Sequence, residues 1–335
     1  MIDIKNSKKI DILLATYNTK IEYLKQQIDS ILSQTYTNIN LIISDDNSSV
    51  EEVRKILTEY KQKDNRIILY FQEENLGYIK NFEFLLSKSN AEYIAFADHD
   101  DIWYENKIER SLQVLEEKDV DLVYCDCKQI DEKGQVLNES YLKYKNLPIV
   151  NGKENILVFS RHIAIGCSTV FTKKIKEQML PFTNKVMAHD WINVYLASKQ
   201  KGIACIEEPL FGYRLHTSNE FGGRSLKQNL SKWKKENGKN YKDYKKYRNE
   251  RVIKKAYLNG ALMCTEYRDK LGLEKTIQEE KTIEYYEKLL KTKIVNFRLA
   301  SYEKYLAFKG IGKRRIKEEM IFHFPLISYL MYLMK

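Results

Sequence analysis

The first 130 residues alternate short apolar runs with amphipathic ones, and this alternation limits the folds available to the chain. The apolar runs are typical of buried strands, whereas Ile21, Leu24, Ile28 and Ile31, between the first two runs, fall on one helical face. Strands that alternate with helices of this length predict an α/β fold with a mostly parallel central sheet, covered by helices on both faces. The expected strands lie in KIDILLATYN, NINLIISDD, RIILYF, AEYIAFAD and VDLVYCDCKQI.

Each of the first four expected strands is followed by a polar cluster. The clusters are TYN (16–18), DDNSS (45–49), ENLG (74–77) and DHDD (98–101). In parallel sheets ligands bind beyond the carboxyl ends of the strands, so four clusters at one edge predict a binding site. Two of the loops also carry capping-box patterns, Thr19 with Glu22 and Ser48 with Glu51, which we expect to begin the first two helices.

The turn after the first strand argues against a dinucleotide site. That turn, ATYNTK, contains no glycine, and no G-x-x-x-x-G-K-[ST] loop is present. The cluster DHDD offers another way to hold a diphosphate, because Mg²⁺ or Mn²⁺ takes carboxylate oxygens together with phosphate oxygens. A cation would also relieve the repulsion among three neighbouring carboxylates. The alternative is a solvated turn that caps the following helix.

Seven segments together resemble family 2 glycosyltransferases with the GT-A (nucleotide-diphospho-sugar transferase) fold. The segments are ATYN, SILSQTYTNINLIISDDNSS, ENLGYIKNF, FADHDDIW, GCSTVF, HDW and YRLH, within about the first 220 residues. The resemblance implies an inverting, metal-dependent enzyme that uses a nucleotide sugar. Within the family, the combination DxDDIW, HDW and YRxH is most similar to bacterial rhamnosyltransferases of cell-surface polysaccharide synthesis.

The resemblance assigns a donor-binding role to residues in the first three polar clusters and just after them. Tyr17 and Asp46 are expected to contact the nucleotide base and ribose, since an aromatic ring can stack on a base and a carboxylate can accept its N3–H. The remaining donor-side residues are Thr16, Asn18, Asn75, Gly77 and Asn81.

The resemblance assigns the cation to the fourth cluster and to a distant histidine. Asp98 and Asp100 match the D-x-D motif, with Asp100 the direct ligand of Mn²⁺ or Mg²⁺ and Asp98 nearer the ribose or a water. Asp101 is expected to lie toward the sugar and the acceptor. His216 would complete the metal shell, although a surface histidine is an equal alternative. Arg214 would meet the diphosphate, because its planar fork suits phosphate oxygens.

Inversion at a sugar carbon needs a base that takes the proton of the attacking acceptor hydroxyl. Asp190, in AHDWINVYLA, is the candidate, and the alternative is an ordinary aspartate that interacts with the dipole at the start of a helix. The other histidines have weaker functional assignments. The role of His99 in the D-x-D is open, and His162 and His323 are expected to be structural.

The 335-residue chain carries its charge unevenly. Residues 225–335 hold 27 Lys and Arg against 13 Asp and Glu, whereas the rest is slightly acidic within a net charge of +10. We therefore expect two domains, an α/β glycosyltransferase domain over 1–224 and a helical, basic region over 225–335. The final segment, GKRRIKEEMIFHFPLISYLMYLMK, suits a helix in the interface of an anionic membrane, or alternatively one packed on the fold or in a homodimer.

The composition also sets expectations for location. The five cysteines form no C-x-x-C pair, which favours buried free thiols in a reducing compartment. No signal-peptide pattern or apolar run of spanning length is visible. We expect a cytoplasmic enzyme, peripheral on the inner face of the membrane, acting on a glycan or lipid-linked glycan and not on nucleic acid.

Two alternatives to a rhamnosyltransferase remain open from the sequence. One is a transferase that uses a UDP-linked hexose or N-acetylhexosamine. The other, from a different class, is a non-catalytic nucleotide- or glycan-binding protein with the same pocket.

Overall fold

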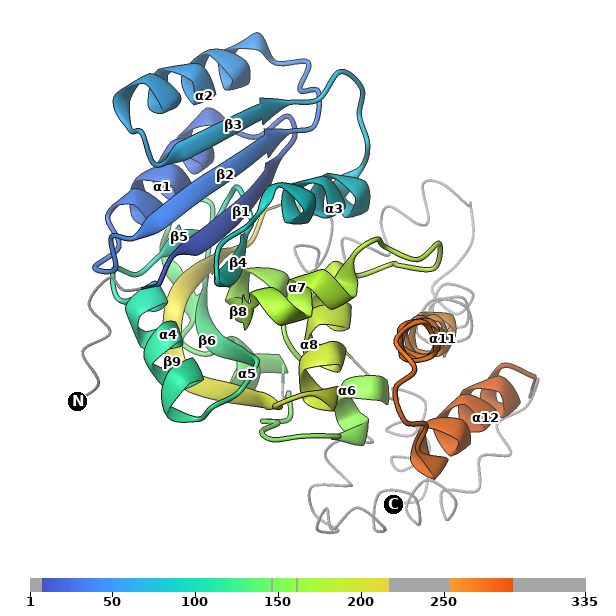
Figure 1. Cartoon of the computed structure of the whole chain (residues 1–335). Coiled ribbons are helices and arrows are strands. Elements are labelled where there is room, and N and C mark those ends of the chain that lie inside the picture. The colour runs from blue at the N-terminus through green and yellow to red at the C-terminus, as the bar shows by residue number, and fades with distance from the viewer. Residues whose placement is uncertain (1–7, 146, 161, 217–253, 292–335) are drawn as a thin grey trace, which may run out of the picture. The chain divides into compact units, whose positions relative to one another are not determined.

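A computed structural model describes residues 8–145, 147–160, 162–216 and 254–291. The first part of the chain follows the expected alternation (Figure 1). Its elements are β1 (Ile10–Thr16), α1 (Ile21–Leu32), β2 (Ile39–Asp45), α2 (Glu51–Lys63), β3 (Ile67–Phe71), α3 (Tyr78–Lys88), β4 (Tyr93–Ala97), β5 (Ile102–Trp103), α4 (Lys107–Glu117) and β6 (Leu122–Ile130).

The second part is less regular and returns to the same sheet. Its elements are β7 (Val136–Asn138), α5 (Tyr141–Lys145), α6 (Ile156–Ser160), the 3₁₀ helix η1 (Gly166–Ser168), β8 (Thr169–Thr172), α7 (Lys173–Met179), α8 (His189–Lys199) and β9 (Ile203–Arg214). Two further helices, α11 (Lys254–Lys270) and α12 (Ile277–Lys291), follow.

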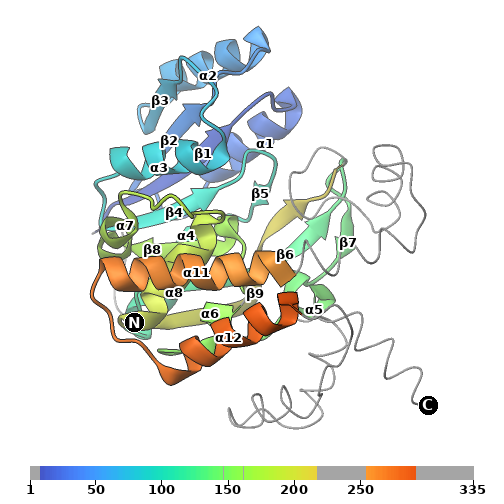
Figure 2. The ribbon, with the colours of Figure 1, turned by 90° about the vertical axis from the view of Figure 1, so that its right-hand side faces the viewer.

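One nine-stranded sheet has the order β3-β2-β1-β4-β8-β6-β9-β5, with β7 paired to β6 (Figure 2). The longer pairs, β1 with β2 and β4, β2 with β3, and β6 with β9, are parallel. The shorter pairs, β8 with β4 and β6, β5 with β9, and β7 with β6, are antiparallel. The sheet is therefore mostly parallel, and the predicted α/β fold is confirmed. Because β1, β2, β3 and β4 run the same way, their carboxyl ends share one edge.

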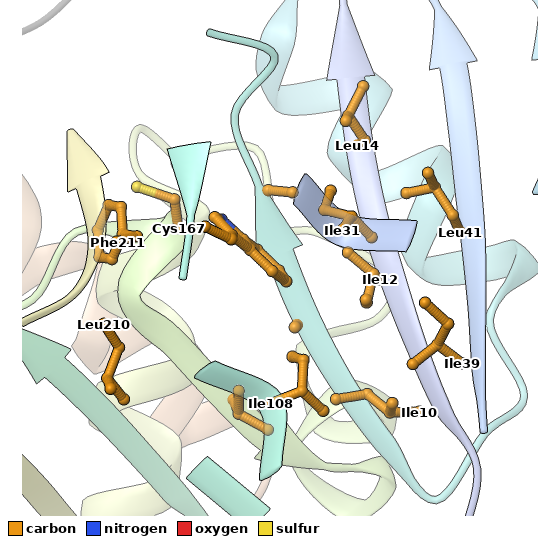
Figure 3. Close-up of a cluster of buried hydrophobic side chains, with 14 of the residues drawn as sticks. Ile10, Ile12, Leu14, Ile31, Ile39, Leu41, Ile108, Cys167, Leu210 and Phe211 are labelled. Carbon is orange, nitrogen blue, oxygen red and sulfur yellow. The ribbon is translucent and has the colours of Figure 1, made fainter. Parts of the chain in front are cut away.

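The core fills both faces of this sheet. On one face, Ile10, Ile12 and Leu14 of β1 pack in a cluster with α1 and α4, of which Ile31 and Ile108 are visible in Figure 3. The intervening Leu13 is fully buried but lies outside that cluster, as the alternation of strand side chains requires. Burial of both faces explains why the strands are almost uniformly apolar.

The two predicted capping boxes are wrong. The helices α1 and α2 follow Lys20 and Val50, and neither helix has a side-chain cap. The Thr19 hydroxyl is 2.7 Å from that of Thr16, and the Ser48 hydroxyl donates to Asp45. Both hydroxyls are thus used to stiffen the loops at the carboxyl edge.

By its backbone contacts the chain divides into two units, and the first comprises Met1–Arg224 together with Gly260–Glu279. The expected boundary at 224/225 thus leaves out a returning segment. This segment is well anchored, since the Tyr267 hydroxyl donates to the Met179 carbonyl at 2.9 Å. Glu279 is buried and pairs with Lys199 at 2.9 Å. The second unit contains Ser225–Asn259 and Glu280–Lys335.

All five cysteines are free thiols, as predicted. Within the part of the chain that the structure describes, no helix is both long and apolar enough to cross a bilayer. The segment GKRRIKEE and the apolar stretch after it lie outside the described residues, as does His323.

Candidate active site

The loops after β1 and β2 are fastened to each other at the carboxyl edge. Asn18 adopts a positive φ of 47°, its amide donates to the Ser48 hydroxyl at 2.8 Å, and its side-chain oxygen accepts the amide of Ser49 at 2.9 Å. Thr16 is buried, whereas Tyr17 is 48% exposed. The structure thus presents an aromatic ring on a braced loop, a suitable surface for stacking on a base.

Asp46 organises the third polar cluster. Its two carboxylate oxygens accept the amides of Leu76 at 2.7 Å and Gly77 at 2.9 Å, and the side-chain amide of Asn75 donates to the Asp46 carbonyl. Gly77 has a φ of 78°, which favours glycine at this entry to α3. The structure therefore brings the expected donor-side residues of two loops into one constellation.

Asn81 lies deeper than the sequence suggests. It is 1% exposed, and its side-chain amide donates to the Ser44 carbonyl at 3.2 Å. The side-chain oxygen of Asn81 has no hydrogen-bond partner among the described residues. In this structure Asn81 supports the loop from beneath.

The carboxylates of the fourth cluster gather at the end of β4. Asp98 is partly buried, and Asp101 is fully buried, with Oδ1 accepting the Arg214 amide at 3.0 Å. Carboxylate oxygens of Asp98 and Asp101 and the Cys167 sulfur all lie within 4.8 Å of one another. Burial and the neighbouring charge of Asp100 raise the pKa of Asp98 to about 6 and that of Asp101 well above its usual range.

Asp100 faces His216. His216 Nε2 donates to Asp100 Oδ2 at 2.7 Å, and both residues are buried. Burial opposes ionisation of Asp100, but the nearby rings of His99 and His216 outweigh it and hold its pKa below the ordinary value.

The residues at this position fit a divalent cation by their donor chemistry. Asp98 and Asp100 offer carboxylate oxygens, and His216 Nε2, which lies against Asp100, offers a lone pair once it has lost its proton. Among the described residues, however, the ligand atoms that converge within 4.8 Å are those of Asp98, Asp101 and Cys167, so the set of Asp98, Asp100 and His216 stays a prediction. Oxygen ligands suit Mg²⁺ and Mn²⁺, and an added imidazole is better matched to Mn²⁺.

Arg214 is not on the surface of the site. It is 1% exposed; Nε donates to the Asp100 carbonyl at 2.7 Å, and Nη1 donates to the Glu132 carbonyl at 3.0 Å. Its guanidinium also lies 4.3 Å from the centre of the Tyr23 ring. In this structure Arg214 braces the DHDD turn, and the expected contact with a diphosphate stays a prediction.

Asp190 lies in the first turn of α8 with both carboxylate oxygens engaged. Oδ2 accepts the Gly166 amide at 2.8 Å, and Oδ1 is 3.0 Å from His162 Nε2. Burial opposes the charge of Asp190, but His162, followed by His189 and the Gly166 amide, outweighs it and holds the pKa of Asp190 at about 2. Asp190 is therefore ionised, as a base must be before it accepts a proton.

The 3₁₀ helix η1 joins the two halves of the site. Gly166 donates to Asp190, and the next residue, Cys167, lies against Asp98 and Asp101. A side chain at Gly166 would approach His189 Nε2 to 3.2 Å and the Asp190 Cβ to 3.3 Å, so only glycine fits without displacement. The predicted base and the D-x-D thus meet through one tight turn.

Residues 11–179 match the sequence profile of glycosyl transferase family 2, and this match spans half of the chain. A relative from Methanocaldococcus jannaschii, the uncharacterized glycosyltransferase MJ1057, is 31% identical over 226 residues, covering 66% of this chain and 76% of its own.

The chain belongs to glycosyl transferase family 2.

Further similarities agree with membership of family 2 and with the fold. TuaG of Bacillus subtilis, whose name provisionally assigns it to teichuronic acid biosynthesis, is 25% identical over 67% of this chain and 85% of its own. A crystal structure of S. aureus TarS with UDP-GlcNAc covers 92% of this chain and 83% of its own, with a TM-score of 0.57 and 12% identity. The predictions of a GT-A fold and of a glycosyltransferase are confirmed.

One contact of this family 2 site was missed by the sequence analysis. His162, expected to be structural, lies against the predicted base. Its ring is also tilted over Trp191 at 5.9 Å between centroids. A separation of 28 residues with no shared periodicity gave no signal for this pairing.

Proposed function

We propose that the protein is an inverting, metal-dependent glycosyltransferase that moves a sugar from a nucleoside diphosphate to a glycan or lipid-linked glycan. The observation that carries the proposal is the turn at Gly166–Ser168. It supports Asp190 through the Gly166 amide and borders Asp98 and Asp101 through Cys167. A base and a carboxylate cluster meet there, as transfer away from a diphosphate requires.

The donor nucleotide binds over the first two loops. The exposed ring of Tyr17 stacks on the base, beside the polar edge formed by Thr16 and Asn18. Asp46 accepts the base N–H with lone pairs left over from its bonds to Leu76 and Gly77. Asn75 and Asn81 keep this loop in place.

Asp100, Asp98 and His216 would hold the cation. When bound, Mn²⁺ or Mg²⁺ neutralises the charge that develops on the leaving diphosphate. Asp101 lies behind these groups toward the sugar and the acceptor. Arg214 fixes the DHDD turn through the Asp100 carbonyl.

Asp190 takes the proton of the acceptor hydroxyl as its oxygen attacks the anomeric carbon. The new carbon–oxygen bond forms on the face opposite the leaving group, so the configuration inverts. The bond from the anomeric carbon to the diphosphate breaks, and the diphosphate leaves with the electron pair. The Gly166 amide keeps the carboxylate of Asp190 in a fixed orientation throughout.

We assign dTDP-rhamnose as the donor because the motifs in 98–103, 189–191 and 213–216 are similar to those of bacterial rhamnosyltransferases. The second candidate is a UDP-linked hexose or N-acetylhexosamine, favoured by the UDP-GlcNAc bound to the structurally similar TarS. A role in surface polysaccharide synthesis follows from the assignment in the name of TuaG. A non-catalytic nucleotide- or glycan-binding protein would use the same pocket without Asp190.

We place the protein in the cytoplasm, peripheral on the inner face of the membrane. The proposed glycosyltransferase domain covers 1–224 and takes in the returning segment 260–279, and the basic region covers the rest of 225–335. The basic, partly apolar C-terminal segment would make the membrane contact, or else a homodimer contact. Both arrangements keep the site close to a lipid-linked acceptor.

A donor screen tests the proposal. Binding and slow hydrolysis of dTDP-rhamnose and UDP-hexoses would be measured with Mn²⁺, with Mg²⁺ and with EDTA, for the wild type, Asp100→Asn and Asp190→Asn. We expect one donor to bind with metal, Asp100→Asn to lose binding, and Asp190→Asn to keep binding but lose transfer. Donor binding that survives EDTA and Asp100→Asn would contradict the metal site, and retained transfer by Asp190→Asn would contradict the base.

A further inference from the structure

The environment of Asp190 contains a second proton acceptor. His162 Nε2 lies 3.0 Å from Asp190 Oδ1, the oxygen that the Gly166 amide leaves free. The His162 side chain is 34% exposed, whereas that of Asp190 is 15% exposed. His162 Nε2 itself is buried, so the exposed part of the imidazole is its opposite edge. A proton that reaches the carboxylate thus has next to it a ring whose other edge can pass a proton to solvent.

The framework around His162 keeps this pair together. Trp191, the residue after Asp190, is buried and donates from its indole nitrogen to the Val158 carbonyl at 2.7 Å. This bond ties α8 to α6, which ends shortly before His162. Gly260 leaves room for the Trp191 ring, since a Cβ there would lie 2.2 Å from it. Trp191, whose ring centroid lies 5.9 Å from that of His162, is therefore held firmly beside the pair.

We infer that His162 is a positioning residue that accepts from Asp190 the proton withdrawn from the acceptor hydroxyl, so that the pair works as a two-step relay. This inference rests on the proposed function, because it assumes that Asp190 is the base. The proton moves from the acceptor oxygen to Asp190 Oδ1 and then to the lone pair of His162 Nε2. The imidazolium releases its Nδ1 proton to water, and proton exchange with water restores the starting tautomer. Asp190 is ionised again at the end, and no other reactant is needed.

The charges around the pair agree with this direction of transfer. Burial alone would lower the pKa of His162, but the carboxylate of Asp190 outweighs it and raises the pKa above its ordinary value of 6.5. The other titratable groups that act on the pair are His189 on the same helix, Asp98 at the end of β4 and Tyr141 on α5. Burial lowers the pKa of His189 to about 4, so His189 is neutral and does not compete for the proton.

The relay predicts a pH dependence with a definite sign. His162 must be neutral to receive the proton, so kcat/KM should rise as the pH passes through the raised pKa of His162. Asp190, with its pKa of about 2, is ionised over the whole working range and cannot produce this limb. A histidine that only fills space would leave the limb unchanged.

Two measurements on the full-length protein test the relay. The first follows the five histidines by NMR with ¹³C-labelled imidazole rings, with His162 assigned from its missing signal in His162→Gln. We expect the His162 midpoint to fall by about one pH unit in Asp190→Asn, because the stabilising carboxylate charge is gone. An equal midpoint in both proteins would overturn the pairing, and this arm needs no turnover.

The second measurement compares kcat/KM against pH for the wild type and His162→Gln. We expect the rising limb to vanish and the plateau to drop about tenfold, with donor affinity unchanged. A limb that persists at the wild-type midpoint in His162→Gln would overturn the relay. If His162→Gln does not fold, His162→Asn takes its place both in the NMR assignment and in the kinetic comparison. Normal sugar transfer by Asp190→Asn would contradict the assignment of Asp190 as the base, and the relay with it. Loss of transfer in Asp190→Asn together with an unchanged pH limb in His162→Gln would contradict the relay alone.

Discussion

The hydroxyl of Tyr78 donates a hydrogen bond to the carbonyl of Met187 at 2.8 Å. Tyr78 is the first residue of α3, directly after the loop that Asp46 holds, and Met187 lies three residues before Asp190. The donor-side loop and the catalytic segment are therefore joined by a direct bond. The stacking of His189 on Phe82, at 4.1 Å between centroids, adds a second link between α3 and α8.

We expect Tyr78→Phe to lower kcat about three- to tenfold while donor affinity stays within twofold, since only about 1 kcal/mol of hydrogen bonding is lost. Steady-state kinetics and calorimetric donor binding would measure this. Tyr60→Phe is the matched control, because Tyr60 donates to Asp29 on an exposed part of α1. An equal effect in both variants would argue against a link between the donor loop and Asp190.

Asp46→Asn should weaken donor binding about 10- to 100-fold, because an asparagine has one acceptor oxygen and cannot receive both loop amides. The loss combines a loosened loop with a missing acceptor for the base. Titration with the nucleoside diphosphate alone is sufficient to measure it. Asp64→Asn, at the turn between α2 and β3 where Asp64 pairs with Arg66, should leave binding unchanged. Wild-type affinity in Asp46→Asn would rule out this arrangement of the donor site.

Arg214→Lys should lower the free energy of unfolding by about 2–4 kcal/mol, because a lysine cannot satisfy the separate carbonyls that the buried fork reaches. The control is Arg66→Lys, since Arg66 also donates to a carbonyl, that of Leu32, but is partly exposed. We expect this control to lose less than about 1 kcal/mol. Denaturant unfolding of the two variants would compare them, and equal stabilities would contradict a structural role for Arg214.

Lys107 gives a prediction for stability against pH. It is fully buried, its Nζ has no hydrogen-bond partner among the described residues, and it lies 3.8 Å from the centre of the Trp103 ring. Burial lowers the pKa of Lys107 below 10.5. Between the lowered pKa of the folded protein and 10.5, Lys107 binds a proton more readily in the unfolded chain than in the folded one. The contribution of Lys107 to stability therefore increases with pH over this range.

We expect Lys107→Met to be at least as stable as the wild type near pH 7, because an apolar side chain avoids the cost of burying an ammonium group. This advantage should shrink as the pH is raised to about 9.5, where the wild-type lysine loses its charge more readily. Urea unfolding at both pH values measures the difference. The exposed Lys118→Met serves as control, and an advantage that grows with pH would contradict the prediction.

The fold could be predicted because its signal is local. Apolar runs and helical periodicity are properties of neighbouring residues, and β1, α1 and β2 appear where they were expected. The capping boxes failed because both hydroxyls have other partners: Thr19 is bonded to Thr16, and Ser48 is bonded to Asp45 and to the amide of Asn18. The burial of Arg214 and the pairing of His162 with Asp190 depend on segments far apart in the sequence, which no local pattern encodes.

The pairing of β6 with β9 has a consequence for any attempt to exchange segments among relatives. From Cys125 to Ile130 β6 advances five residues, whereas β9 advances eight from Ile206 to Arg214, and the register shifts lie on either side of Asp126. The three additional residues of β9 are taken up in these irregularities, which bend a strand and increase its local twist. A chimaera that took β9 without its extra residues would lose this bend, and with it the angle at which Arg214 approaches the DHDD turn, so the two strands must be exchanged together.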